Sequence, residues 1–301
     1  MSSSATENVV SQIGAEEALK SSAARLSVMA AAFLIILKTI TGFLTGSISV
    51  WASLLDSVMD ILASTINFLA VRAAARPADE DHAYGHGKAE SLAGLFQAAV
   101  IAGSGIYLIS EAIRRLFEPR PISSQWIGVT TMLIATLVSL ALVSRLKRVA
   151  RATESPALHA DATHYVTDIY TNLGALIALL VTALTDWQRA DPLISIIIAG
   201  YILWSGVSVA REAVDILMDR RLPVDVDEQI ANIVLRYRSE GVLGFHDLRT
   251  RRSGSQKFID LHLEIDRDMR LAEAHELTVR VLRDIETEIP RAHVQIHTDP
   301  A

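Results

Sequence analysis

The sequence predicts an α-helical membrane protein, with a bundle of six transmembrane helices followed by a small α+β domain. Half of the 301 residues are hydrophobic, and mean hydropathy is +0.32. The apolar residues form long blocks separated by short charged connectors, and each block reaches the roughly 20 residues that a helix needs to cross a bilayer. Beyond Pro223 the chain becomes charged and soluble in character. A membrane domain and a separate C-terminal domain are therefore expected.

These blocks divide the chain into a polar N-terminal tail at 1–24, a six-span transmembrane domain at 25–216 and a C-terminal domain at 217–301. The first two dozen residues carry acidic side chains and lack the short apolar core of a secretory signal peptide. Lys and Arg are more frequent in the connectors on the side of the termini, which predicts that both termini are cytoplasmic. The predicted spans lie at 26–48, 50–73, 91–113, 124–145, 160–185 and 191–214.

The C-terminal domain predicts an open-faced αββαβ sheet of the ferredoxin-like type. In the central strand, strict alternation places Ile259, Leu261, Leu263 and Ile265 on the face that the helices cover. Acidic residues and His262 fall on the opposite face. The predicted elements are a helix at Val226–Ser239, strands at Gly244–Arg252 and Lys257–Asp266, a helix at Ala272–Glu288 and a strand at His293–Thr298.

Two pairs of ionisable residues interrupt the apolar blocks. Asp56 and Asp60 lie in the second span, and His164 and Asp168 lie in the fifth. Each pair is spaced i, i+4, so both side chains project from one helix face. A charged side chain in the bilayer costs at least about 2.5–3.5 kcal/mol on insertion scales, so four such groups favour a bound ion over simple polar packing. The pairs predict one ion site between the two spans.

The ligand types favour zinc. The chain has no cysteine, so metal ligands must be nitrogen or oxygen atoms. Three carboxylates and one imidazole suit a tetrahedral divalent cation, with Zn²⁺ the first choice and Fe²⁺, Cd²⁺ or Mn²⁺ the alternatives. Protons compete with metal for the same ligands, so alternating access would let an inward proton gradient drive metal outward.

Three further ionisable residues lie in or close to the predicted spans. His159 and Asp161 come soon after Pro156 and could themselves be the ligands, with His164 and Asp168 as packing groups, but we expect both to be solvated residues at the start of a helix. Lys38 lies deep in the first span, where it would snorkel or pair with an acid that the sequence does not identify.

Several motifs, taken in their order along the chain, resemble those of a known family. They are the Asp-x-x-x-Asp and His-x-x-x-Asp pairs, the connector His82-Ala-Tyr-Gly-His-Gly-Lys-Ala-Glu90, and the segments His246-Asp-Leu-Arg-Thr-Arg251 and Ile296-His-Thr-Asp-Pro300. From about residue 25 onward the chain resembles the cation diffusion facilitator family, and it is most similar to the bacterial zinc and iron efflux members.

The resemblance implies a homodimer in the bacterial cytoplasmic (inner) membrane that exports divalent cations in exchange for protons, with no enzymatic activity. It makes Asp56, Asp60, His164 and Asp168 the transport site. It implies a connector site at Asp79, His82 and His86, although by sequence alone these could be a solvated loop. It also implies a Lys88–Asp219 interlock at the dimer contact. The implied cytoplasmic metal cluster comprises His246, His262, His275, His297 and Asp299.

Other functions fit the sequence less well. A metal-sensing scaffold without transport would need only the C-terminal cluster, yet this chain retains all four intramembrane ligands. A membrane metalloenzyme is disfavoured because no His-Glu-x-x-His motif or nucleophile lies beside the site. Nucleic-acid binding is disfavoured because no basic patch interleaved with aromatics appears. A metal/proton antiporter is the expected function.

Overall fold

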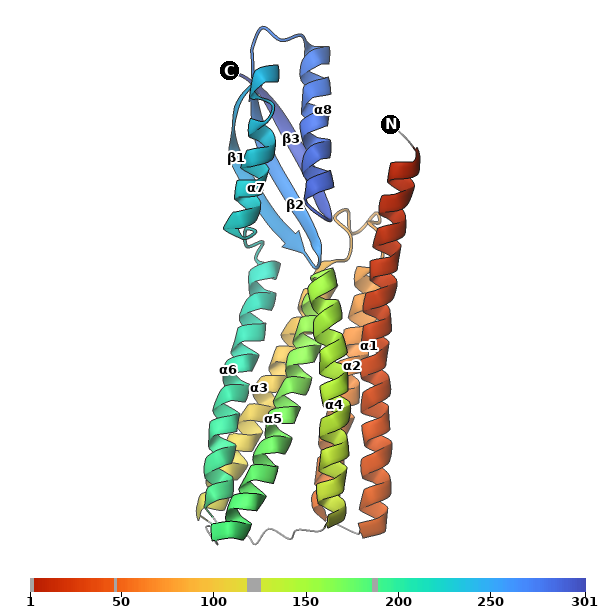
Figure 1. Ribbon diagram of the computed structural model, residues 1–301, viewed down its shortest axis with the longest axis vertical. Helices are drawn as coiled ribbons and strands as arrows, with labels where there is room; N and C mark the ends of the chain where they lie inside the picture. The colour runs from red at the N-terminus through yellow and green to blue at the C-terminus, as the bar shows by residue number, and fades with distance from the viewer. Residues whose placement is uncertain (1–2, 46–47, 118–125, 186–188) are drawn as a thin grey trace. The chain divides into compact units, whose positions relative to one another are not determined.

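The computed structural model describes residues 3–45, 48–117, 126–185 and 189–301, and it divides into two compact units at residues 214 and 215. Within these ranges the side chains at 3–13, 42, 44–45, 48–56, 126–128, 179 and 182–183 are not described. The first unit is helical and the second is α+β (Figure 1).

Long helices make up the first unit, with one predicted span in each. Residues 3–24, expected as a polar tail, continue without a break into the first span. The helices are α1 (Ser3–Thr45), α2 (Ile48–Ala74), α3 (Lys88–Phe117), α4 (Trp126–Thr153), α5 (Pro156–Thr185) and α6 (Ala190–Leu217).

Five helices of the described chain are long and apolar enough to cross a membrane. The qualifying segments are Gly14–Thr41, Ser57–Ala74, Lys88–Phe117, Val129–Thr153 and Ala190–Leu217. The described part of α5 is not among them, because side chains in its apolar second half lie outside the described ones, and Asp161, His164 and Asp168 lower the hydropathy of the first half.

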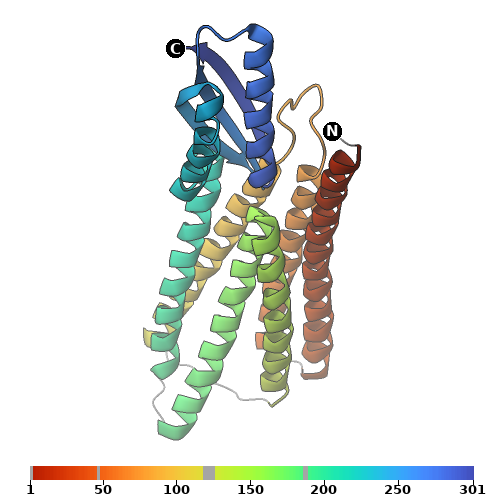
Figure 2. The ribbon, with the colours of Figure 1, turned by 45° about the horizontal axis from the view of Figure 1, so that its top comes forward.

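The helices pack so that α2 and α5, which carry the predicted ligands, are central. Helix α2 contacts α1, α3 and α5, and α5 also contacts α3 and α4. Figure 2 shows α1 beside α2 and α4. Small residues such as Ala157 and Ala162 of α5 are fully buried in the shared core, which lets the helices approach closely.

A buried charged cluster fastens α1 to α3 and to the start of α5. The ammonium group of Lys20 lies 3.1 Å from Glu90 and 2.7 Å from Glu17. Ser155, just before α5, donates a 2.5 Å hydrogen bond to the other oxygen of Glu90. Lys20 and Glu90 are each only 1% exposed. Burying two charges costs free energy, and the contacts with Glu17 and Ser155 help to offset that cost.

The second unit follows the predicted order of helices and strands. It contains α7 (Val224–Leu235), a 3₁₀ turn η1 (Arg238–Glu240), β1 (Val242–Ser253), β2 (Gln256–Ile265), α8 (Leu271–Glu288) and β3 (Ala292–Pro300). The first predicted helix ends four residues early, because the chain tightens into η1 and then turns at Gly241, which has φ of 111°.

The three strands form one sheet in the order β1-β2-β3, with β1 antiparallel and β3 parallel to β2. Ile259, Leu261, Leu263 and Ile265 of β2 are buried in a core with α7 and α8, as the alternation predicted. Because both helices contribute to this one core, the opposite face of the sheet is left to polar side chains.

Candidate metal centres

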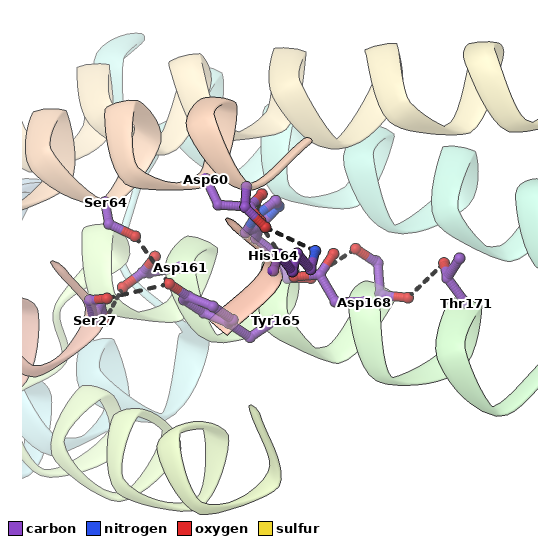
Figure 3. Close-up of polar contacts among 11 residues, drawn as sticks. Ser27, Asp60, Ser64, Asp161, His164, Tyr165, Asp168 and Thr171 are labelled. Carbon is purple, nitrogen blue, oxygen red and sulfur yellow. Dashed lines mark hydrogen bonds and ion pairs between the residues drawn. The ribbon is translucent and has the colours of Figure 1, made fainter. Parts of the chain in front are cut away.

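One centre lies between α2 and α5. The Nε2 atom of His164 is 3.0 Å from Asp60 Oδ1 and 3.7 Å from Asp168 Oδ2. These three residues each offer one donor atom within 4.8 Å of the other two. Figure 3 shows the Asp60 carboxylate of α2 directed at the imidazole from α5. The packing of α2 on α5 thus brings together residues that lie 104 positions apart in the sequence.

These separations fit a small tetrahedral cation. Ligand atoms about 2.0–2.1 Å from a zinc ion lie about 3.3 Å from one another at tetrahedral angles. The measured 3.0 and 3.7 Å bracket that value. His164 is 2% exposed, whereas the carboxylates of Asp60 and Asp168 are half-buried.

The fourth predicted ligand, Asp56, lies on α2 outside the described side chains. Its neighbour Ser57 is fully buried and accepts a 2.7 Å hydrogen bond from the ammonium group of Lys38. The lysine deep in the first span therefore reaches the segment of α2 that carries Asp60.

The expectation for Asp161 was wrong. This carboxylate is 0% exposed, and it accepts a 2.6 Å hydrogen bond from Ser27 of α1 (Figure 3). Asp161 precedes His164 by three residues, so it shares that residue's face and turns into the bundle. This spacing of three residues before His164 was the sequence signal that Asp161 lies on the same helix face. His159 is exposed as expected, and its Nε2 lies 3.8 Å from Glu212 of α6.

Tyr165 holds α5 against its neighbours. Its buried hydroxyl donates to the backbone carbonyl of Ser27 at 3.3 Å and lies 3.1 Å from the hydroxyl of Ser64 on α2. Because a buried phenol needs partners, these contacts fix the rotation of α5 relative to α1 and α2. The orientation of His164 on the same helix depends on that rotation.

A second group of potential ligands lies in the connector between α2 and α3. Asp79 accepts the backbone N–H of His82 at 2.7 Å, and its other oxygen lies 3.2 Å from Nε2 of His86. That backbone hydrogen bond lowers the pKa of Asp79 below its usual value. Nδ1 of His86 lies 3.2 Å from the carbonyl of Pro77, so a proton there would leave Nε2 available as a ligand.

A third group lies on the open face of the C-terminal sheet. His246, His262 and His297 occupy paired positions on the three strands, with adjacent ring centroids 5.1 and 4.8 Å apart. Asp299 contacts all three imidazoles at 2.9–3.4 Å. The hydrogen bond with His262 lowers the pKa of Asp299, which keeps the carboxylate charged.

The backbone of β1 also shapes this face. The register shifts between His246 and Arg249, and Asp247 adopts a φ of 50°, which are features of a β-bulge beside a site. Glu264, whose carboxylate lies 3.0 Å from Nδ1 of His246, belongs to this face but was not among the predicted ligands. The alternation that grouped it with His262 was the available signal.

Two predictions for the C-terminal unit concern His275 and the interlock between Lys88 and Asp219. His275 is exposed on α8 and does not join the group around Asp299 within this chain. Asp219 accepts a 3.3 Å hydrogen bond from Arg251 of its own unit. Lys88 belongs to the other unit, so its interlock with Asp219 stays a prediction.

Comparisons with known proteins agree with this organisation. Residues 24–218 match the cation efflux transmembrane domain, and residues 222–301 match the cation efflux protein cytoplasmic domain. The chain is 44% identical to the cation-efflux pump FieF of Yersinia pestis (strain Pestoides F) over 92% of each chain. It is 41% identical to FieF of Klebsiella pneumoniae over 94% of this chain and 93% of that protein.

A solved structure of the metal-bound C-terminal domain of the CzcD transporter from Thermotoga maritima also matches. It covers 26% of this chain and 88% of that domain at 31% identity, with a TM-score of 0.24.

Proposed function

Because this chain belongs to the cation efflux family, whose members are multi-pass membrane transporters and not enzymes, we propose that it exports a divalent metal ion in exchange for protons. The observation that carries this proposal is the approach of His164 Nε2 to carboxylates on two helices, at 3.0 and 3.7 Å. Asp56, Asp60, His164 and Asp168 form the transport site in this proposal. Zinc is the transported ion, with Fe²⁺, Cd²⁺ and Mn²⁺ as alternatives.

The choice of zinc rests on the donor atoms. An imidazole nitrogen favours Zn²⁺ over Mg²⁺ or Ca²⁺, which prefer shells of six or more oxygens. Carboxylates supply enough negative charge to strip water from a divalent ion. Four protein ligands in a tetrahedron are the usual arrangement for zinc.

Exchange with protons follows from the same ligands. His164 and the carboxylates bind metal only when they are deprotonated, so metal and protons exclude each other at the site. When the site faces the cytoplasm, metal binds and protons leave. When it faces outward, protons bind and release the metal. An inward proton gradient thereby drives efflux.

This mechanism requires a defined topology. We assign six spans, with α5 as the fifth, in the bacterial inner membrane and with both termini in the cytoplasm. The domains are a tail at 1–24, a transmembrane domain at 25–216 and a cytoplasmic domain of the ferredoxin-like type at 217–301. α5 is packed against four other helices, and Asp161 and His164 in its first half are buried in the bundle, away from lipid.

The connector and cytoplasmic groups are proposed as resident zinc sites. Asp79, His82 and His86 present three donor atoms within 4.8 Å, as do His246, His262 and Asp299, so both groups fit a zinc ion. His297 and Glu264 complete the cytoplasmic cluster. Metal bound there would couple the cytoplasmic zinc concentration to the stability of a homodimer, in which Lys88 and Asp219 form the interlock.

The test is proton-coupled uptake in everted membrane vesicles and in proteoliposomes, with Zn²⁺, Fe²⁺, Mn²⁺ and Cd²⁺ supplied in turn. Wild-type protein should exchange zinc for protons, and Asp168→Ala should abolish exchange. Glu212→Gln, which changes a carboxylate on α6 beside exposed His159, serves as the matched control and should transport normally.

Two results would contradict the proposal. Unchanged exchange by Asp168→Ala protein would show that the ion does not use this site. Zinc binding by wild-type protein without any flux would instead favour the alternative, a metal-sensing scaffold without transport.

A further inference from the structure

We propose that Asp161 is a positioning residue for the transport site, whose carboxylate accepts a hydrogen bond from Nδ1–H of His164 while Nε2 binds the ion. This inference rests on the proposed function of His164. It assigns a role to a buried acid that lies outside the predicted ligand set.

Two buried polar atoms lead to this assignment. Nδ1 of His164 and Oδ1 of Asp161 are both buried, and within the described part of the chain neither has a hydrogen-bond partner. The residues are 2% and 0% exposed. Nδ1 is a donor when protonated and Oδ1 is an acceptor, so each offers what the other lacks; Nδ2 of Asn67 on α2, also buried without a partner among the described residues, is a second donor beside Asp161.

Metal binding makes the donor obligatory. A neutral imidazole that binds metal through Nε2 must carry its proton on Nδ1. Leaving that N–H buried without an acceptor would cost the free energy of desolvating it. Histidine ligands in proteins almost always donate this second N–H to a carboxylate, a carbonyl or water, which orients the ring and raises its basicity.

The surroundings of Asp161 hold its carboxylate in place for this role. Ser27 of α1 donates a 2.6 Å hydrogen bond to Oδ2, which leaves Oδ1 as the other acceptor. Asp161 lies one helical turn before His164, so the two side chains share a face of α5. A rotation of the imidazole as Nε2 turns to the ion, or one bridging water, would complete the hydrogen bond.

The decisive variant is Asp161→Asn, because an amide oxygen can still accept the hydroxyl of Ser27 while the negative charge is lost. Zinc affinity is measured by chelator competition on the purified full-length protein. Each protein is titrated with and without the additional Asp168→Ala substitution. The difference between the two titrations gives the zinc bound at the transport site, separate from the other metal sites. Thr136→Val is the control, because it removes a buried polar group from α4 of the same bundle and leaves Asp161 unchanged.

We expect Asp161→Asn to weaken zinc binding at the transport site about 10–100-fold and to raise the half-saturating zinc concentration for flux. The melting temperature should stay close to that of Thr136→Val, since the hydrogen bond with Ser27 is retained. A purely structural role predicts a lower melting temperature or no change at all. Folded Asp161→Asn protein with wild-type affinity would overturn the inference.

A second measurement needs no substitution of Asp161. In zinc-loaded wild-type protein with labelled histidine, NMR should show an Nδ1–H signal from His164 that exchanges slowly and is shifted as expected for a hydrogen bond to a carboxylate. A rapidly exchanging or absent signal would also overturn the inference. Failure of zinc to bind through His164 at all would instead refute the proposed function.

Discussion

Substitution of Glu90 by Ala should destabilise the helical unit strongly. Glu90 lies within 3.1 Å of the Lys20 ammonium group and accepts a 2.5 Å hydrogen bond from Ser155, and it is 1% exposed. Removing one partner of a buried ion pair typically costs about 3–5 kcal/mol. Glu17 remains 2.7 Å from Lys20, so we expect the lower end, about 3 kcal/mol.

This cost converts to a measurable change in melting temperature. For units of about 150–250 residues, each kcal/mol shifts the melting temperature by about 2–4 °C, so the expected fall is about 6–12 °C. Tryptophan fluorescence during heating of the purified protein in detergent provides the measurement. Glu111→Ala is the matched control on the same helix, because its contacts with Arg114 and Arg115 are exposed.

A double substitution tests the physical reason. Lys20→Met with Glu90→Leu removes both charges, and it should be more stable than Glu90→Ala alone because no buried ammonium group has lost a partner. A fall of less than about 2 °C for Glu90→Ala, or a double variant less stable than the single one, would refute the reasoning.

Three further results are expected. His164→Ala should lower zinc flux in proteoliposomes and alter its dependence on pH, since the imidazole binds both metal and protons; an unaltered pH profile would count against this site. The fragment 220–301, which contains its own hydrophobic core, should bind zinc in calorimetric titration, and Asp299→Ala should weaken binding at least tenfold; equal affinities would exclude the cytoplasmic cluster. Burial and a 2.6 Å hydrogen bond to Asp284 raise the pKa of Tyr237 to about 12. The neutral phenol is favoured by folding, so this stabilisation is complete below about pH 10 and is lost as the pH rises toward 12. Absorbance of the folded protein at high pH should show this late titration, and Asp284→Asn should bring it earlier.

Local pattern was enough to predict most of the secondary structure. Apolar blocks of membrane-spanning length anticipated the helices α1 to α6, because length and hydropathy are properties of short segments. Strict alternation anticipated the buried face of β2 for the same reason. The i, i+4 spacing of His164 and Asp168 identified one helix face. Each of these features depends on neighbours along the chain.

Contacts between distant segments were beyond the reach of pattern alone. Proximity to Pro156 suggested that Asp161 was solvated, yet the packing of α1 on α5 buries it against Ser27. The packing of α1 on α2 likewise brings Ser57 to 2.7 Å from the ammonium group of Lys38, a contact that spacing along the chain does not reveal. Glu264 was on the correct face of its strand, but only the pairing with β1 brings it to His246.

The sequence by itself therefore determined the helices, the C-terminal sheet, the candidate ligand residues and the family. The tertiary structure decided which ligands meet, with Asp60 of α2 3.0 Å from His164 of α5 and the strand histidines in one row across the sheet. The physical reason is that residue type and spacing fix which face of an element a side chain occupies. Only the packing of whole elements fixes what that face contacts.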